Sequence, residues 1–168
     1  MCGRYSLTTA PEALRRLFNF DNMPNLAPRY NIAPTQDVPV IRRADGGDDA
    51  NGRRLSMMRW GLVPSWSKDI GRSAPMINAR AETIAEKPSF RAAFQSRKCL
   101  VPADGFYEWR LENGKKQPFR IGMNGGAPFA FAGLWERWAS PEGDEINSVA
   151  IVTTEANEKL RPIHARMP

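Results

Sequence analysis

Residues 100–138, with the sequence LVPADGFYEWRLENGKKQPFRIGMNGGAPFAFAGLWERW, contain the pattern that decides the fold class. Three runs rich in aromatic and aliphatic residues, Phe106–Leu111, Phe119–Met123 and Phe129–Trp138, are separated by turn-forming residues such as Asn113-Gly114. Asn-Gly favours the tight turns of β-hairpins because both residues tolerate positive φ angles. The stretch therefore predicts antiparallel strands joined by hairpins rather than by crossover helices.

The same pattern continues on both sides of this stretch. Further strands are predicted at Val38–Arg43, Leu55–Trp60, Leu100–Val101 and Val149–Thr154. Further turns are predicted at Asp45-Gly46-Gly47, Asn124-Gly125-Gly126 and Glu142-Gly143-Asp144. Residues 10–19 and 88–97 read as short helices, the first with a capping box formed by Thr9 and Glu12. The predicted fold is α+β and mostly antiparallel, with a strongly bent sheet or β-barrel-like core and a few short helices.

Composition places the chain among globular proteins. Of its 168 residues, 42% are apolar and 25% are charged, which excludes a disordered chain. We find no repeat and no linker-like shift in composition, so a single domain over residues 1–168 is predicted. No apolar run is long enough to span a membrane, and Arg4, Arg15 and Arg16 stand where a secretory signal would be apolar. The expected location is therefore the cytoplasm.

The cysteine and histidine counts limit the kinds of site. Cys2, Cys99 and His164 are the only residues of these two types, too few for a structural zinc site or a disulfide framework. We therefore expect reduced thiols, no metal and no cofactor. The net charge is +6, and arginine supplies 18 of the 24 basic residues. Because the guanidinium group binds phosphate with paired hydrogen bonds, a nucleic-acid partner is one interpretation and a solvated basic surface is the other.

The N-terminus carries a reactive group of its own. Methionine is ordinarily removed before a small second residue, and removal of Met1 would leave Cys2 with an α-amine and a thiol on adjacent carbons. Such an aminothiol reacts with an aldehyde to form first an imine and then a five-membered thiazolidine, and intramolecular closure of this kind is strongly favoured. The alternative is that Cys2 merely follows the start codon.

Five segments taken together decide between these readings. They are Met1-Cys2-Gly3-Arg4-Tyr5, Tyr30-Asn31-Ile32-Ala33-Pro34, Ile77-Asn78-Ala79-Arg80-Ala81-Glu82, Asp104-Gly105-Phe106-Tyr107-Glu108-Trp109 and Ile163-His164-Ala165-Arg166-Met167-Pro168. In this order they resemble the SOS-response-associated peptidase (SRAP) family, whose members trap abasic sites in single-stranded DNA. The resemblance runs from residue 1 to the end of the chain.

The resemblance implies a role for each matching residue. Cys2 would bond covalently to the ring-opened sugar, and Asn78 would help to hold the adduct. Glu108 would act as general acid and base at the terminal amine, with a pKa raised by a neighbouring aromatic such as Trp109. His164 would move protons during ring opening. The positions implied to bind DNA are Arg4 and Arg80 for phosphates, Trp66 and Pro34 for bases, Thr153 in the lining of the site, and Arg166.

Each of these residues also has a structural interpretation. Trp66 and Trp109 read singly as core aromatics, Asn78 as a turn residue, Glu108 as a surface carboxylate and His164 as a satisfied polar group. The sequence also departs from the family in two places. The usual His-Asp-Arg-Met-Pro has Ala165 at its second position, and family members normally continue beyond the point where this chain stops, so the C-terminal part usual in the family is expected to be lacking.

Three functions remain open from the sequence. The first is a DNA-damage-response enzyme that removes its own Met1, an autopeptidase and thus a cysteine hydrolase, and crosslinks abasic sites, with a possible lyase activity. The second is an N-terminal-nucleophile peptidase or amidase acting on other substrates. The third is a non-catalytic module that binds single-stranded DNA. For the first we expect a monomer that meets replication and repair machinery, is associated with the nucleoid if bacterial, and does not bind a membrane.

Overall fold

The computed structural model describes residues 2–44, 52–68, 70, 75–140 and 142–168. The strands are β1 Tyr5–Leu7, β2 Arg29–Ile32, β3 Asp37–Arg43, β4 Arg53–Trp60, β5 Asn78–Arg80, β6 Lys98–Ala103, β7 Gly105–Glu112, β8 Lys115–Ile121, β9 Phe129–Ala139, β10 Glu145–Glu155 and β11 Arg166–Met167. The helices are α1 Pro11–Phe18, α2 Arg91–Ser96 and the 3-10 turn η1 Asn124–Gly126. Neither α1 nor α2 has the length and hydropathy that a membrane span requires.

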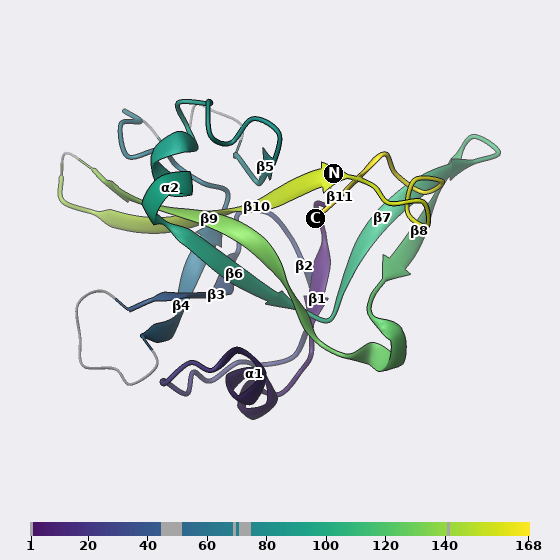
Figure 1. The fold of residues 1–168 in the computed structure, drawn as a ribbon, viewed down its shortest axis with the longest axis horizontal. Coiled ribbons are helices and arrows are strands. Elements are labelled where there is room, and N and C mark those ends of the chain that lie inside the picture. The colour runs from purple at the N-terminus through teal and green to yellow at the C-terminus, as the bar shows by residue number, and fades with distance from the viewer. Residues whose placement is uncertain (1, 45–51, 69, 71–74, 141) are drawn as a thin grey trace.

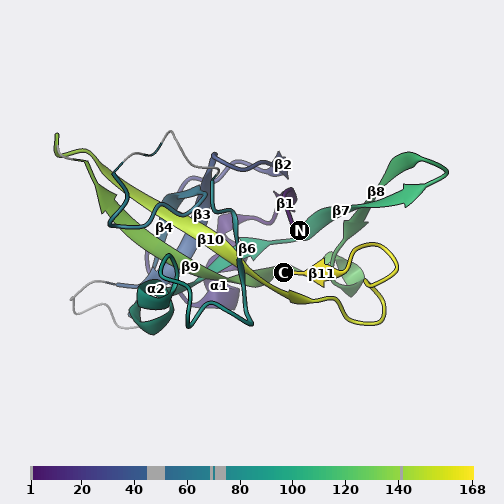
Figure 2. The ribbon, with the colours of Figure 1, turned by 90° about the horizontal axis from the view of Figure 1, so that it is seen from above.

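Five strands close into a barrel. Neighbouring strands pair in the order β10, β4, β3, β6 and β9, and β9 pairs again with β10. The long strands β9 and β10 run from one end of the molecule to its middle (Figure 1), and a second sheet of order β2-β1-β7-β8 lies beside the barrel (Figure 2). The α+β fold with a barrel-like core and mostly antiparallel strands is thus confirmed. The exceptions are β4 and β5, which pair with β10 in parallel and are joined to it by long connections.

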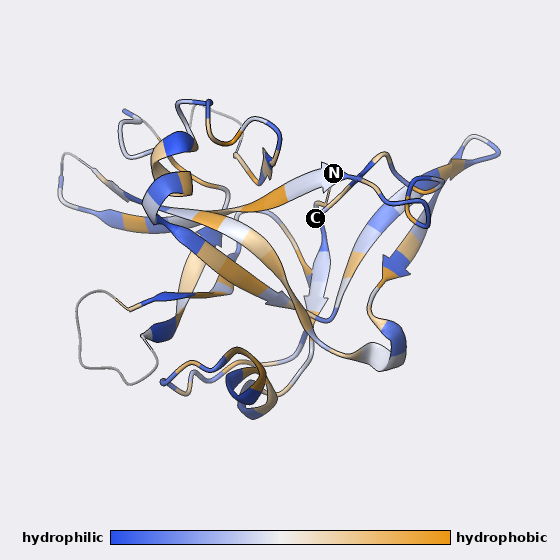
Figure 3. Cartoon of the chain, viewed as in Figure 1, coloured by the Kyte–Doolittle hydropathy of each residue, from blue (hydrophilic) through white to orange (hydrophobic). Residues whose placement is uncertain are grey.

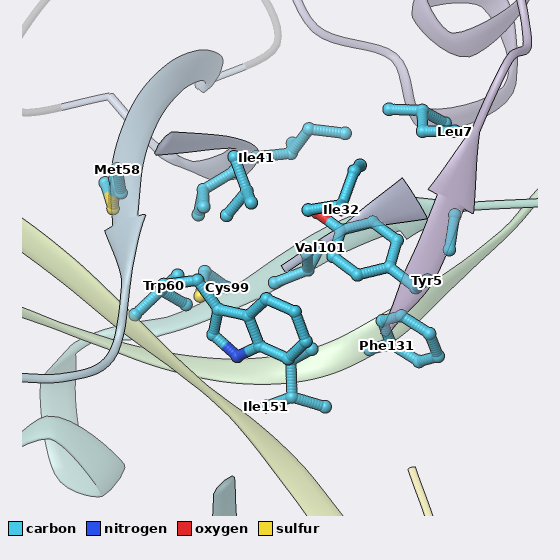
Figure 4. Close-up of a cluster of buried hydrophobic side chains, with 14 of the residues drawn as sticks. Tyr5, Leu7, Ile32, Ile41, Met58, Trp60, Cys99, Val101, Phe131 and Ile151 are labelled. Carbon is cyan, nitrogen blue, oxygen red and sulfur yellow. The ribbon is translucent and has the colours of Figure 1, made fainter. Parts of the chain in front are cut away.

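The core fills the barrel and joins it to the second sheet. Tyr5 of β1 packs edge-on against Trp60 of β4 and Phe131 of β9, with ring centroids 5.4 and 5.6 Å apart (Figure 4). All three side chains are at least 97% buried, since their exposed fractions are 0%, 0% and 3%. In Figure 3, hydrophobic residues gather on β6, β9 and β10, and hydrophilic residues on α2. Burial of these rings therefore fixes the strand that follows Cys2 against the barrel wall.

Both helices form, but their starts differ from the prediction. The expected capping box is wrong, because α1 has Ala10 at its N-cap and no side-chain cap. Thr9 donates both its backbone N–H and its hydroxyl to Asp104 instead, so tertiary contacts outcompete the local cap. The second helix begins only at Arg91, with Phe90 at its N-cap and residues 88–90 in turns.

Each predicted strand is present, generally longer than expected, and four short strands were missed. The missed strands β1, β2, β5 and β11 have between two and four residues and show no alternation of their own. The turn at Asn113-Gly114 joins the β7–β8 hairpin as predicted, with φ angles of 49° and 76°. The turn at Glu142-Gly143-Asp144 joins β9 to β10, also as predicted. Asn124-Gly125-Gly126 makes no hairpin, because it leads from the second sheet into the barrel, and Asp45-Gly46-Gly47 lies outside the described residues.

Gly133 of β9 gives a direct test of barrel packing. A Cβ atom there would lie 2.9 Å from Sγ of Cys99 and 3.2 Å from Val101. We expect Gly133→Ala to lower the free energy of unfolding by about 1 to 3 kcal/mol, because the close-packed wall has no room for a methyl group. Urea denaturation measures this, with Ala132→Ser at the exposed neighbouring position as the control. Equal stability of the two variants would contradict the packing described here.

Candidate functional site

Cys2 lies buried at the start of the second sheet. Its exposed fraction is 0%, and its Sγ lies 3.9 Å from the carbonyl oxygen of Arg4. Burial, followed by the negative charge of Glu108, raises the pKa of the Cys2 thiol to about 12. The thiol of the chain that still carries Met1 is therefore protonated at neutral pH, and it needs a base to become a nucleophile.

Asn78 holds the backbone of Cys2. It stands at the start of β5, where the parallel register with β10 pairs it with Ile151. Its Nδ2 donates a hydrogen bond to the carbonyl oxygen of Cys2 at 3.0 Å. Its Oδ1 is buried and has no hydrogen-bond partner in the described part of the chain. Asn78 thus fixes residue 2 and keeps one acceptor available beside it.

Glu108 reaches the same place from β7. The antiparallel register pairs Tyr5 with Phe106, and the N–H of Tyr107 donates to the carbonyl of Arg4 at 2.9 Å, so β7 runs past Cys2. Glu108 is only 4% exposed, and its charge acts on the Cys2 thiol. Trp109 is 38% exposed and lies on the other face of the strand, so the burial of Glu108 comes from other neighbours. A buried carboxylate beside a thiol can take up and return a proton.

His164 is oriented by the strand that follows it. The backbone N–H of Arg166 donates to Nδ1 of His164 at 3.0 Å, and the carbonyl oxygen of Arg166 lies 3.1 Å from the same atom. Both backbone groups of Arg166 therefore contact Nδ1, which fixes the orientation of the His164 ring.

Arg166 ties β11 to β10 and to the turn that follows β5. Its Nη2 donates to the carbonyl oxygen of Thr153 at 2.7 Å and to Oε2 of Glu82 at 2.9 Å. The hydrogen bond from Arg166 lowers the pKa of the exposed Glu82 carboxyl. Thr153 is 1% exposed and lies in register with Arg80. Ala165 has no carboxylate, so the acidic partner of Arg166 comes from Glu82.

The remaining candidates for DNA binding are more exposed. Arg4 donates to Oδ1 of Asn31 at 3.0 Å, which directs its guanidinium group along β2. Arg80 is exposed two residues after Asn78, and Trp66 is 64% exposed. Pro34 is half-buried in a turn whose next residue donates its N–H to the carbonyl of Trp60 at 2.8 Å.

The structure gathers the candidates into two groups that share β5. Cys2, Asn78 and Glu108 form the first, and Arg80, Thr153 and Arg166 the second. The start of β1 and the C-terminal end of the chain lie side by side in both Figure 1 and Figure 2. In the described ranges, no three His, Cys, Asp or Glu side chains gather into a group that could hold a metal ion.

A family model described as SOS response associated peptidase (SRAP) matches residues 1–168. The chain belongs to this family. Among the relatives of this SRAP chain, "Abasic site processing protein YoqW" of Bacillus subtilis (strain 168) is 45% identical over 172 residues, covering 100% of this chain and 75% of the relative. "Abasic site processing protein HMCES" of Xenopus tropicalis is 31% identical, covering 100% of this chain and 62% of its own length.

A solved structure agrees with the fold of the SRAP chain. A protein from Bacteroides thetaiotaomicron superposes with a TM-score of 0.87 at 27% sequence identity, covering 99% of this chain and 75% of that one. The likeness spans the barrel and the second sheet together.

Three residues of the candidate site received no role from the sequence. Asn31 directs Arg4, Glu82 pairs with Arg166, and Asp104 hydrogen-bonds the residues after β1. All three lie inside the five motif segments, and this position is the signal by which the sequence could have indicated them. Each acts through another side chain or a backbone group, so residue type alone did not suggest its role.

Proposed function

We propose that this chain is a DNA-damage-response protein that removes Met1 and captures abasic sites in single-stranded DNA through Cys2. The observation that carries the proposal is the arrangement around residue 2. Asn78 donates a hydrogen bond to the carbonyl oxygen of Cys2, and the negative charge of the buried Glu108 acts on the Cys2 thiol. The names of YoqW and HMCES, both abasic site processing proteins, support it.

Removal of Met1 is a hydrolysis. One water molecule is consumed, the Met1–Cys2 amide bond breaks, and methionine leaves with a new carboxylate. Glu108 would accept the proton of the attacking group and return it to the departing amine. The product has a free α-amine at Cys2, whose positive charge beside the thiol favours the thiolate and so lowers the thiol pKa from its precursor value.

Capture of the lesion is a condensation. The α-amine adds to the aldehyde carbon of the ring-opened deoxyribose, water leaves, and an imine forms. The thiol sulfur then bonds to the same carbon while its proton moves to nitrogen, which closes the thiazolidine. No oxidant or reductant is needed. Holding the amine, the thiol and the sugar together makes the second step intramolecular, and effective molarities of about 10⁵ M or more are known for such closures. His164 would donate a proton to the sugar as its ring opens.

DNA binding would use three arginines, one threonine and two apolar residues. Arg4, Arg80 and Arg166 would contact phosphates, with Arg166 sharing its donors between Glu82 and DNA, and Thr153 would line the site. Trp66 and Pro34 would press on the bases beside the lesion. Stacking of this kind is worth about 1 to 3 kcal/mol per base and does not depend on base identity, as a protein that searches for damage requires.

The deciding experiment combines a gel with intact-mass spectrometry. The protein is mixed with a single-stranded oligonucleotide that contains one true abasic site, and a tetrahydrofuran analogue without an aldehyde serves as the control. We expect a shifted band on a denaturing gel when the protein is mixed with the abasic DNA, and no shifted band with the tetrahydrofuran control. Its mass should equal the protein without Met1 plus the DNA, less one water. A wild-type protein that gives no adduct would end the proposal.

Glu108→Gln tests the acid and base role. The amide cannot take up a proton, so we expect adduct formation at neutral pH to slow by about 10² to 10⁴-fold. Glu112→Gln is a matched control because Glu112 lies four residues further along β7 and its side chain is 40% exposed. Quenched time courses on denaturing gels measure both rates. Equal rates for the two variants would exclude Glu108 from the chemistry.

Arg80→Gln tests the phosphate contact. Binding of tetrahydrofuran DNA should weaken, and the slope of log K against log salt should fall by about 0.7 for the one lost contact on a single strand. Arg91→Gln, an exposed arginine on α2, is the control of equal charge change. Fluorescence anisotropy across a salt series gives both slopes. An identical decrease of the slope in the two variants would indicate general electrostatic attraction rather than a phosphate contact at Arg80.

A further inference from the structure

Trp66 stands at the tip of a short segment that we call the Trp66 turn, residues Leu62–Ser67. The N–H of Ser67 donates to the carbonyl of Pro64 at 2.9 Å and closes the turn. The Trp66 side chain is 64% exposed, although Leu62 and Val63 in the same turn are 2% and 8% exposed. The turn therefore presents a large aromatic ring to solvent, while the residues at its start are buried.

Two buried side chains of the barrel hold the turn at both ends. The hydroxyl of Ser148 on β10 accepts the N–H of Val63 at 2.9 Å, and Ser148 is 0% exposed. The indole N–H of Trp138 on β9 donates to the carbonyl of Ser67 at 2.7 Å, and Trp138 is 5% exposed. The two anchoring bonds lie on either side of Trp66, so the backbone of the turn is bonded to the barrel at both ends.

The turn is also linked to the site. The N–H of Leu62 donates to the carbonyl of Met76 at 3.0 Å, two residues before Asn78. Gly61, just before the turn, has a φ of 137° and its Cβ position is closed by Pro75, at 2.9 Å. The chain therefore leaves β4 in a conformation suited to glycine, and the first residue of the turn is hydrogen-bonded to a residue close to β5.

We propose that Trp138 and Ser148 are positioning residues that hold the Trp66 ring ready to stack on a nucleobase of the bound strand. This rests on the function proposed above. A ring carried on an anchored backbone loses less conformational entropy on stacking than a ring on a mobile loop, and that difference appears as affinity. The anchors act through the turn, so they should affect how tightly DNA binds rather than how fast bound lesions react.

The test separates binding from chemistry. Trp138→Phe keeps an aromatic ring but loses the N–H donor, and Ser148→Ala loses the acceptor for Val63. The probe for binding is a fluorescent single-stranded oligonucleotide with a tetrahydrofuran site, which cannot form an adduct. We expect each variant to raise Kd about three- to tenfold, within the range that loss of preorganised stacking allows, while adduct formation at saturating abasic DNA stays within about twofold of wild type.

A double-mutant cycle with Trp66→Ala decides the mechanism. In the Trp66→Ala background the anchors have nothing to position, so we expect Trp138→Phe and Ser148→Ala to change Kd no further. The thermal unfolding of each variant is measured so that the folded fractions can be compared. The inference would be overturned by a wild-type Kd in both anchor variants. It would also be overturned if the anchor variants lost affinity equally with and without Trp66. If wild type binds the tetrahydrofuran probe yet forms no adduct with true abasic DNA, the proposed function fails while the cycle still tests the anchors.

Discussion

Replacing Cys2 by alanine is expected to abolish the stable adduct with abasic DNA. Alanine is also small, so Met1 removal by cellular aminopeptidase would still leave an α-amine at residue 2. That amine can form an imine, but without sulfur no second bond closes on the same carbon. The imine hydrolyses back to aldehyde and amine, so the band on a denaturing gel should fall to background, a change of several hundredfold or more in keeping with the effective molarity of the lost ring closure.

Borohydride and a serine variant sharpen this test. Reduction traps an imine as a stable amine, so Cys2→Ala should give a band only when borohydride is present during the incubation. Cys2→Ser matches cysteine closely in size and supplies a much weaker nucleophile, so it should behave like alanine. The buried Cys99→Ala is the control for loss of a thiol elsewhere and should keep the adduct. A stable band from Cys2→Ala without reductant would show that the bond is made by another residue.

The second large effect is expected at Asp104, where Asp104→Asn should lower the free energy of unfolding by about 3 kcal/mol. The carboxylate is 3% exposed and accepts hydrogen bonds from Ser6, Thr8 and Thr9 at the end of β1. Arg120 lies 3.3 Å from its Oδ1. An amide would turn a donor toward several of these N–H and O–H groups and leave them unsatisfied in the interior. Urea denaturation measures the loss, with the exposed Asp37→Asn as control.

The effect of Asp104 should depend on pH in a defined direction. Burial opposes ionisation, but the hydrogen bonds from Ser6 and Thr8 outweigh it and lower the pKa of the Asp104 carboxyl. A lowered pKa contributes stability that is complete above the unfolded value of about 3.9 and is lost as pH falls through the folded value. The difference in stability between wild type and Asp104→Asn should therefore be constant near neutral pH and narrow below about pH 4. A difference that grows on acidification would contradict the direction of the shift.

Asp104 also matters for the site, because it joins the two strands on which the chemistry depends. It precedes β7, which carries Glu108, and its hydrogen bonds reach the strand that follows Cys2. We therefore expect the folded fraction of Asp104→Asn to form the adduct more slowly as well.

The prediction of this fold succeeded where neighbouring residues decide the structure. The hairpin at Asn113-Gly114 follows from the φ angles that these two residues tolerate, and the long strands follow from runs of apolar residues. The capping box failed because Thr9 has a better partner in Asp104, far along the chain. The parallel pairings of β10 with β4 and β5 were missed because no turn or short-range pattern announces them.

For the site, the sequence alone determined which residues are available: a cysteine at position 2, one histidine, and motif segments that resemble a known family in order. Only the tertiary structure decided that Asn78 bonds the carbonyl of Cys2, that burial and then the charge of Glu108 raise the pKa of the thiol, and that Trp138 and Ser148 hold the Trp66 turn. Turn preference depends on residues next to each other. Hydrogen bonds, desolvation and charge coupling depend on distances across the fold, which exist only once the barrel has closed.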